Sequence, residues 1–396
     1  MRSTSCEFLA QYLLESCIAG NPPERLPRAL LEEACAKALF GILVEGLGDR
    51  FESALCDAYA RLFSQAIEGQ DAASLVARYD RVRCTRRVEW EPKRVLVLSR
   101  VTLGADVAVT SVLLAAAKQA WANAEIVFVG PRKNFELFAA DERLSHAAVE
   151  YRRGSLRERL AVWDELKLLA ADPGCLVIDP DSRLTQLGLL PVCEEDRYRL
   201  FESRRYGGAS EDNLPALAAQ WAHETLGVPD AAPYVAVGQA SGLSTPYIAV
   251  SLGVGENPAK RIADPFEQDL LALLATRAPL VIDKGAGGEE AARVERASGG
   301  NATFWDGSFA GWCLFHGVLI ESRLLCCLIL RRSGFLKTSR FPRTATQDEE
   351  KNQRQGGEKE LSHRCLSTEQ ESKMIEDSND TCHFDAQPDF LPGISK

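Results

Sequence analysis

Hydrophobic residues in the first 90 positions recur every three to four residues, which is the spacing of an amphipathic helix. One such set contains Leu55, Tyr59, Leu62, Phe63 and Ala66. The pattern predicts a helical extension over residues 1–90. Because this stretch has neither paired acids nor a glycine loop, packing is its default role. Oligomerisation and the covering of a binding cleft are the functional alternatives.

From about residue 91 the pattern changes to short apolar runs alternating with helical segments. The first run, residues 95–98, is continuously apolar, as in a strand buried on both faces, and a Gly/Ala turn leads from it into a helix near 108–122. This alternation predicts a doubly wound α/β fold. The first turn lacks G-x-G-x-x-G, so a nicotinamide-binding domain is disfavoured. Further strands are expected at 125–129, 149–151 and 175–178, and helices at 135–140, 157–171 and 213–226.

A second α/β segment follows a predicted hinge at 228–233. It has a buried strand at 247–252 and a glycine-rich basic loop at 253–261. A helix is expected next, with Asp264 as its N-cap and Pro265 at its first position. Glycines, a lysine and a helix N-terminus together predict an anion-binding site. The next strand is expected at 279–282, followed by a Gly/Glu loop at 283–290.

Apolar periodicity stops near residue 325, and the chain from 333 to 396 is rich in Ser, Thr, Gln, Glu and Lys. This composition predicts a disordered tail. A doubly wound sheet that stopped here would leave an uncovered edge strand. We therefore expect residues from about 325 onward to come from a shifted reading frame or a mis-joined coding segment. The predicted parts are a helical extension (1–90), a complete Rossmann-like domain (91–232), a partial one (233–325) and the tail (326–396).

Composition and charge argue against several classes of protein function. The 396 residues carry a formal net charge of -10 with a pI near 5.3, which argues against nucleic-acid binding because no basic excess faces the phosphates. No continuous apolar segment reaches membrane-spanning length and no signal peptide is recognisable, so a cytoplasmic location is expected. The 12 cysteines show no zinc spacing and are predicted to be free thiols, and no metal site is expected.

Polar residues follow two of the predicted strands of the first domain. Asp106 lies at the start of the helix after the first strand, where a carboxylate is either a helix cap or a working group. Asp179, Asp181 and Arg183 follow the strand at 175–178 and form either a simple turn or part of a site. Arg204 and Arg205 form a short basic loop that suits either an anionic ligand or solvent.

The segment Arg100, Thr102–Val107 and Thr110 resembles the opening loop of the heptosyltransferases, glycosyltransferase family 9. The family usually has Gly before the Asp and Pro after the following turn, where this chain has Ala105 and Val112. In the second segment, Ser251, Asn257, Lys260 and Pro265–Glu267 match the family's donor loop, although the Trp usual after the Lys is absent. An Asp-Ser-Gly-x-x-His loop expected after Arg323 is also missing.

The resemblance implies a GT-B architecture, that is, two Rossmann-like domains of which the second is incomplete here. It implies that Asp106 is the general base. It also implies an acceptor side made of Asp179, Asp181, Arg183, Arg204 and Arg205. The implied donor-binding residues are Ser251, Gly253, Gly255, Asn257, Lys260, Arg261, Gly287 and Glu289.

The activity implied by the resemblance is an inverting, metal-independent transfer of a heptose-like sugar from a nucleotide sugar, ADP-heptose-like, to a lipopolysaccharide-type glycan or lipid-linked acceptor. No cofactor is implied, and a peripheral contact with the cytoplasmic face of the inner membrane is expected. One alternative is an inactivated homologue that binds the acceptor only. Another is a nucleotide-sugar epimerase of the same architecture.

Overall fold

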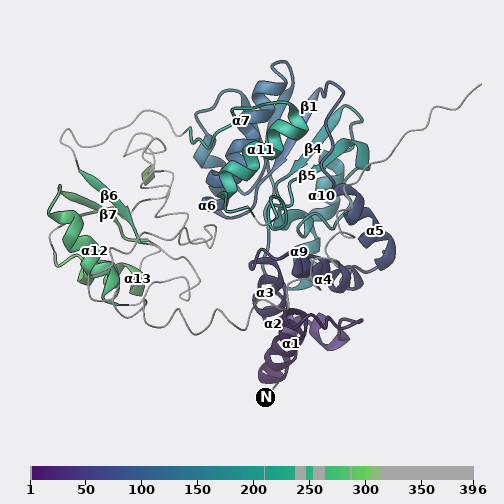
Figure 1. Cartoon of the computed structure of the whole chain (residues 1–396), viewed down its shortest axis with the longest axis horizontal. Coiled ribbons are helices and arrows are strands. Elements are labelled where there is room, and N and C mark those ends of the chain that lie inside the picture. The colour runs from purple at the N-terminus through teal and green to yellow at the C-terminus, as the bar shows by residue number, and fades with distance from the viewer. Residues whose placement is uncertain are drawn as a thin grey trace, which may run out of the picture. The chain divides into compact units, whose positions relative to one another are not determined.

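The computed structural model describes residues 2–208, 210–236, 247–252, 264–285, 288–300, 302–305, 307 and 311–312. The predicted tail (326–396) and the whole glycine-rich loop at 253–261 lie outside these residues. Within them, the predicted α/β fold with two parallel sheets is confirmed (Figure 1).

The N-terminal extension is helical, as its periodicity predicts. Its helices surround a core that includes Leu39, Leu43, Tyr59 and Phe63, all buried. The elements are α1 (Arg2–Ile18), η1 (Arg28–Leu31), η2 (Glu33–Cys35), α2 (Ala36–Ala38), η3 (Leu39–Val44), α3 (Glu45–Gly48), α4 (Ser53–Phe63), η4 (Ser64–Ala66) and α5 (Ala72–Val82).

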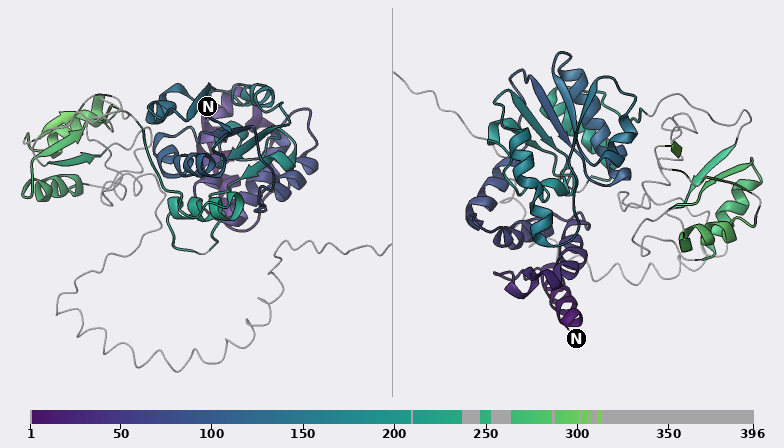
Figure 2. Two further views of the ribbon diagram at one scale, coloured as in Figure 1. Left: turned by 90° about the horizontal axis from the view of Figure 1, so that it is seen from above. Right: turned by 180° about the vertical axis from the view of Figure 1, so that it is seen from behind.

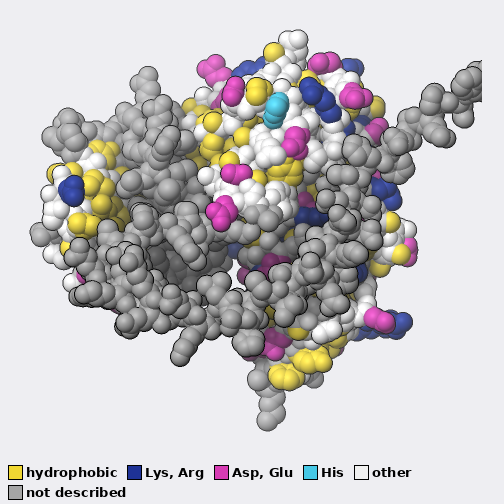
Figure 3. Space-filling view, in the orientation of Figure 1, with side chains coloured by type: hydrophobic (Ala, Val, Ile, Leu, Met, Phe, Trp, Pro, Cys, Tyr) yellow, Lys and Arg dark blue, Asp and Glu magenta, His cyan; other side chains and the backbone are white. Residues whose placement is uncertain are grey.

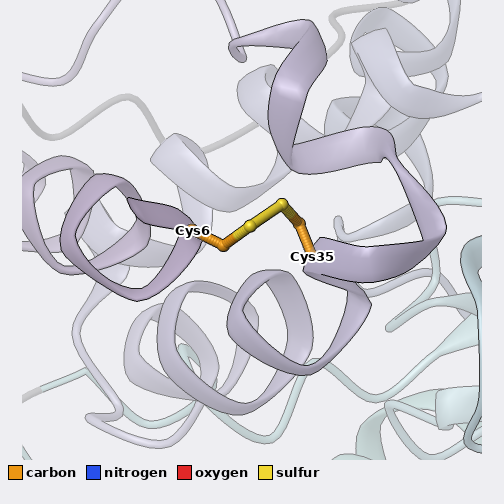
Figure 4. Close-up of a disulfide and its surroundings, with 2 residues drawn as sticks. All are labelled: Cys6 and Cys35. Carbon is orange, nitrogen blue, oxygen red and sulfur yellow. A yellow bond between two sulfur atoms is a disulfide. The ribbon is translucent and has the colours of Figure 1, made fainter. Parts of the chain in front are cut away.

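A disulfide joins Cys6 of α1 to Cys35 of η2 (Figure 4). The prediction that these two cysteines are free thiols is therefore wrong. Apolar packing of α1 against the rest of the extension brings the two Cα atoms to 5.4 Å, which is within bonding range. The sequence alone could not show this, because the two positions are 29 residues apart and carry no spacing motif.

Removing this disulfide should destabilise the extension. Closing a loop of 29 residues lowers the entropy of the unfolded chain, so the C6S/C35S variant should lose about 3 kcal/mol of unfolding free energy. Thermal melting with and without dithiothreitol measures the effect. The reductant should lower the melting temperature of the wild type and leave that of the variant unchanged, and equal sensitivity of both proteins would contradict the bond.

The first sheet has five parallel strands in the order β3-β2-β1-β4-β5. In register, Val95 of β1 lies beside Ile126 of β2 and Leu176 of β4. The strands are β1 (Arg94–Leu98), β2 (Glu125–Gly130), β3 (Leu144–Ala148), β4 (Cys175–Asp179) and β5 (Tyr198–Leu200). The connecting elements are α6 (Leu103–Ala105), η5 (Asp106–Thr110), α7 (Ser111–Ala120), α8 (Arg132–Phe135), η6 (Glu136–Phe138), α9 (Leu156–Leu160), α10 (Val162–Leu169), η7 (Arg183–Thr185), η8 (Glu195–Arg197) and α11 (Leu214–Leu226).

Alternate residues of β1 enter two different cores. Val95 and Val97 pack with α7 and α11, whereas Leu96 and Leu98 belong to the core that includes α10 and the N-terminal helices. The continuous apolar run thus reflects a strand covered on both faces, and Figure 2 shows helices on both sides of the sheet. The N-terminal helices share one core with the first sheet.

Several predicted boundaries are wrong. The third strand is β3 (Leu144–Ala148) instead of 149–151, because this edge strand is only half buried and its apolar pattern is weak. The three-residue strand β5 was not predicted. The helical run after β1 begins at Leu103 instead of near 108. The N-cap of α12 is Pro265 instead of Asp264. By contrast, the helix predicted at 213–226 is present as α11, which Asn213 caps and Gly227 ends in the left-handed conformation.

The predicted hinge packs against the first sheet's helices. Val228, Ala231 and Val235 are buried in the core formed with α7 and α11. Ala236 N also donates to Leu137 O at 2.8 Å, and Tyr234 OH donates to Asp141 at 2.9 Å. The predicted hinge therefore packs on this part of the chain, and its role as a hinge stays a prediction.

The second sheet has three parallel strands in the order β6-β7-β8. Val250, Leu271, Ile282 and Val294 form its core. The sequence pattern did not predict the three-residue strand β8. The elements are β6 (Ile248–Ser251), α12 (Phe266–Ala275), β7 (Leu280–Asp283), α13 (Gly288–Ala297) and β8 (Thr303–Trp305).

The described residues include one long apolar helical run and one exposed group of hydrophobic side chains. The helical run Leu103–Ala120 is long and apolar enough to cross a membrane, but 61% of it is buried, as in a core helix. Hydrophobic side chains are also exposed over the N-terminal helices, where Phe8 and Tyr12 of α1 are 73% and 59% exposed (Figure 3). Neither feature tests the predicted membrane contact.

Candidate functional site

The candidate site lies at the carboxyl ends of β1 and β4, which are neighbours at the centre of the first sheet. The chain turns from β1 toward β2 on one side and from β4 toward β5 on the other. In open α/β sheets ligands bind outside the strand ends at this point of reversal. Ser182 Oγ spans the two ends by donating to the backbone oxygen of Ser99.

Asp106 is fully buried at this point, in the second turn of the helical run that follows β1. Its Oδ1 accepts from Arg100 N at 2.7 Å and from Thr110 Oγ1 at 2.6 Å. Its Oδ2 accepts from Ser99 Oγ at 2.7 Å and from Asn134 Nδ2 at 2.5 Å. The helix N-cap is Thr102, so the interpretation of Asp106 as a cap is wrong. Asp106 instead ties the end of β1 to the helix and to α8.

Two opposing effects act on this carboxylate. Burial, the larger, raises the pKa of Asp106, while the hydrogen bonds from Thr110, Ser99, Arg100 and Asn134 lower it. The net direction is upward from the ordinary value of 3.8. A carboxylate with a raised pKa holds a proton more readily than an exposed one, which is what proton abstraction from a hydroxyl requires.

The backbone is strained at both strand ends. Val101 after β1 has φ 65° and Asp181 after β4 has φ 67°. A β-branched residue rarely adopts such a φ, and it costs on the order of 1–3 kcal/mol. The backbone N–H of Val101 donates to Ser99 Oγ at 2.8 Å, and this hydrogen bond holds the turn. Strain of this kind clusters at functional sites.

Arg100 bridges the two sides of the reversal point. Its Nη1 donates to Pro180 O at 3.0 Å and to Ser203 Oγ at 2.6 Å. Ser203 Oγ in turn donates to Asp181 Oδ2 at 3.0 Å. Sequence reasoning missed Ser99, Asn134 and Ser203. For Ser99 the available signal was a polar residue directly after a buried strand.

The five predicted acceptor residues divide into two groups. Asp181 accepts from Arg204 Nε at 2.8 Å and Nη2 at 2.6 Å, and both side chains are buried, as is Asp179. Arg183 is partly exposed and pairs with Asp49 of the extension at 3.4 Å, and Arg205 is exposed. Asp179, Asp181 and Arg204 are thus held inside the carboxyl edge of the first sheet, and an acceptor role for all five residues stays a prediction.

The N-terminal helices pack on the rim beyond β4. Glu202, which follows β5, accepts from Tyr79 OH at 2.6 Å and from Arg83 Nε at 2.9 Å. Tyr59 OH donates to Gln186 O, which follows β4, at 3.0 Å. The extension therefore packs against the loops that follow β4 and β5, while its role in covering a binding cleft stays a prediction.

Asp179 should titrate far from the usual range of an aspartate. Burial raises its pKa to about 6, against hydrogen bonds from Thr185, Tyr198 and Ser182 N that lower it. The folded protein then binds this proton more tightly than the unfolded chain does. Stability relative to the D179N variant should fall as the pH rises from about 4 to about 6. Carboxyl 13C NMR should give a midpoint near 6, and a midpoint near 3.8 would contradict the burial argument.

Few of the predicted donor residues are described. Ser251 at the end of β6 donates to Asp283 Oδ2 at 2.8 Å, which joins the ends of β6 and β7. Glu289 is exposed in the first turn of α13. Among the described residues no group of three metal-binding side chains is present. The residues outside the description are Gly253, Gly255, Asn257, Lys260, Arg261 and Gly287.

No protein-family model and no curated protein matches the chain. Among solved structures it is similar to E. coli heptosyltransferase WaaC with ADP, with a TM-score of 0.41 and 15% identity over 56% of this chain and 78% of that one. It is also similar to the glycosyl transferase family 9 structure from Veillonella parvula, with a TM-score of 0.40 and 14% identity over 55% and 70% of the two chains.

Proposed function

We propose that this chain is a glycosyltransferase that moves a heptose-like sugar from a nucleotide-sugar donor to a hydroxyl of a glycan acceptor, with inversion and without a metal. The observation that supports this best is a buried carboxylate, Asp106, at the reversal point of the first sheet beside Arg100. A buried, oriented carboxylate at a ligand-binding position suits proton abstraction. A cytoplasmic location with peripheral contact to the inner membrane is part of the proposal.

In the proposed reaction the acceptor hydroxyl attacks the anomeric carbon as the bond to the diphosphate breaks. Asp106 takes the hydroxyl proton, and the nucleoside diphosphate leaves with the bonding electron pair. The backbone amides of the 253–257 loop and Lys260 would stabilise the negative charge that develops on the diphosphate. Because both oxygens of Asp106 already accept two hydrogen bonds, one donor must move before the hydroxyl can bind.

A non-catalytic acceptor-binding protein is the second candidate. It is favoured by the complete burial of Asp106 and by the N-terminal helices that occupy the rim beyond β4. Calorimetric titration with a panel of nucleoside diphosphate sugars, followed by a transfer assay, separates the candidates. Donor binding with turnover supports the enzyme, and absence of donor binding to the folded protein supports the binding protein.

Replacing Lys260 by Ala tests the donor assignment. The variant should lose at least about tenfold in donor affinity, since a charge-assisted phosphate contact is removed, while acceptor affinity stays unchanged. Arg277→Ala, which removes another cation that follows α12, serves as the matched control. Equal losses of donor and acceptor affinity in Lys260→Ala would contradict the assignment.

A further inference from the structure

Asn134 stands apart from the other donors to Asp106. Ser99, Arg100 and Thr110 belong to the continuous β1–turn–helix segment that also contains Asp106, whereas Asn134 belongs to α8 after β2. Its Nδ2 donates to Asp106 Oδ2 at 2.5 Å, so α8 is tied directly to the carboxylate. No part of the sequence pattern singled out this residue.

Exposure also distinguishes Asn134. Ser99, Asp106 and Thr110 are 0% exposed, while Asn134 is 5% exposed. Its neighbours Arg132 and Lys133 on α8 are exposed. Of the three side chains that donate to the carboxylate, Asn134 is therefore the one that retains some solvent exposure.

The two oxygens of Asp106 are held differently. Oδ1 accepts from a backbone amide and from a threonine on the same helical run, and both are fixed by that segment. Oδ2 accepts from Ser99, which is fixed at the strand end, and from Asn134 on a separate short helix. Displacing Asn134 frees one acceptor position on Oδ2 without disturbing the β1 turn.

We propose that Asn134 is a positioning residue that orients the Asp106 carboxylate and closes the path from solvent to Oδ2. The inference rests on the proposed function and assigns Oδ2 as the oxygen of Asp106 that receives the acceptor proton. The charged group beside the carboxylate on the β1 turn is Arg100, whose guanidinium interacts electrostatically with Asp106. Opening at α8 is the step that admits the hydroxyl.

Two substitutions separate the orienting role from the closing role. Asn134→Leu removes the Nδ2 hydrogen-bond donor but keeps a branched side chain in its place, so water should stay excluded from Oδ2. Loss of one hydrogen bond to the charged form should then raise the Asp106 pKa further. Asn134→Ala removes the donor but admits water, which solvates the carboxylate, so its pKa should lie clearly below that of the Leu variant.

The measurement is carboxyl 13C NMR on the full-length protein with labelled aspartate. The Asp106 resonance is assigned as the signal that is missing from the spectrum of the D106N variant. Lys133→Ala, on the same short helix, is the matched control and should leave the titration unchanged. Thermal melting establishes that each variant is folded. An unshifted titration in folded Asn134→Leu overturns the orienting role, and equal pKa values in the Leu and Ala variants overturn the closing role.

These titrations require no substrate, so their outcome is independent of the proposed function. If a transfer activity is measured, Asn134→Leu should move the acidic limb of its pH–rate profile to higher pH, because the base stays protonated longer. A purely structural role would lower stability without moving that limb.

Discussion

Replacing Asp106 by Asn should lower the rate of sugar transfer by about two to four orders of magnitude, the usual contribution of a general base. It should also lower the unfolding free energy by about 1–3 kcal/mol, because an amide cannot accept hydrogen bonds at both Oδ positions. Its NH2 group would face donors at Ser99 Oγ and Asn134 Nδ2. A transfer assay and urea unfolding measure the two effects.

Asp164→Asn is a suitable control for this substitution. Asp164 lies on α10 with a side chain that is 89% exposed, and its pair with Lys167 is a surface ion pair. The control should retain the wild-type transfer rate and change stability by less than about 1 kcal/mol. If Asp106→Asn lowers stability but leaves the transfer rate unchanged, Asp106 holds the β1 turn and is not the base.

Replacing Asp181 by Asn should lower the unfolding free energy by about 3–5 kcal/mol, because the change leaves the Arg204 guanidinium buried without a counter-charge. The side chains of Arg204 and Asp181 are 3% and 0% exposed. Asn tolerates the positive φ of this position, so the backbone contributes little to the loss. Urea unfolding followed by circular dichroism measures the difference.

The Arg183–Asp49 pair provides the matched comparison, because its side chains are 26% and 59% exposed. Asp49→Asn should cost less than about 1 kcal/mol. The double variant D181N/R204M should recover much of the loss, since an apolar side chain needs no counter-charge. Similar losses for Asp181→Asn and Asp49→Asn would show that burial of the first pair does not determine its energy.

The buried Asp181–Arg204 pair also connects the N-terminal helices to Arg100. Arg204 holds Asp181, Asp181 accepts from Ser203, and Ser203 accepts from Arg100. Glu202 lies next to Ser203 in sequence and accepts hydrogen bonds from Tyr79 of α5 and from Arg83, the C-cap of α5. Contacts therefore connect the extension to the turn that carries Arg100.

The sequence by itself determined the helical extension, the parallel α/β character of both sheets and the position of Asp106 at the end of β1. These features depend on local periodicity and on the order of strands and helices, and both can be recognised in the sequence without knowledge of tertiary contacts. The sequence pattern did not predict β3 at its observed position and did not predict β5, because a half-buried edge strand and a three-residue strand leave little periodic signal. The family resemblance added a role for Asp106 that periodicity cannot give.

Only the tertiary structure decided which side chains meet. Asn134 reaches Asp106 across 28 residues, Tyr79 reaches Glu202 across 123, and Cys6 bonds Cys35 across 29. The structure also determined that Asp181 and Arg204 form a buried ion pair, a partnership that their positions in the sequence do not reveal. The physical reason is that burial and partner choice are set by packing between elements, and packing is not encoded in the spacing of residues along any one element.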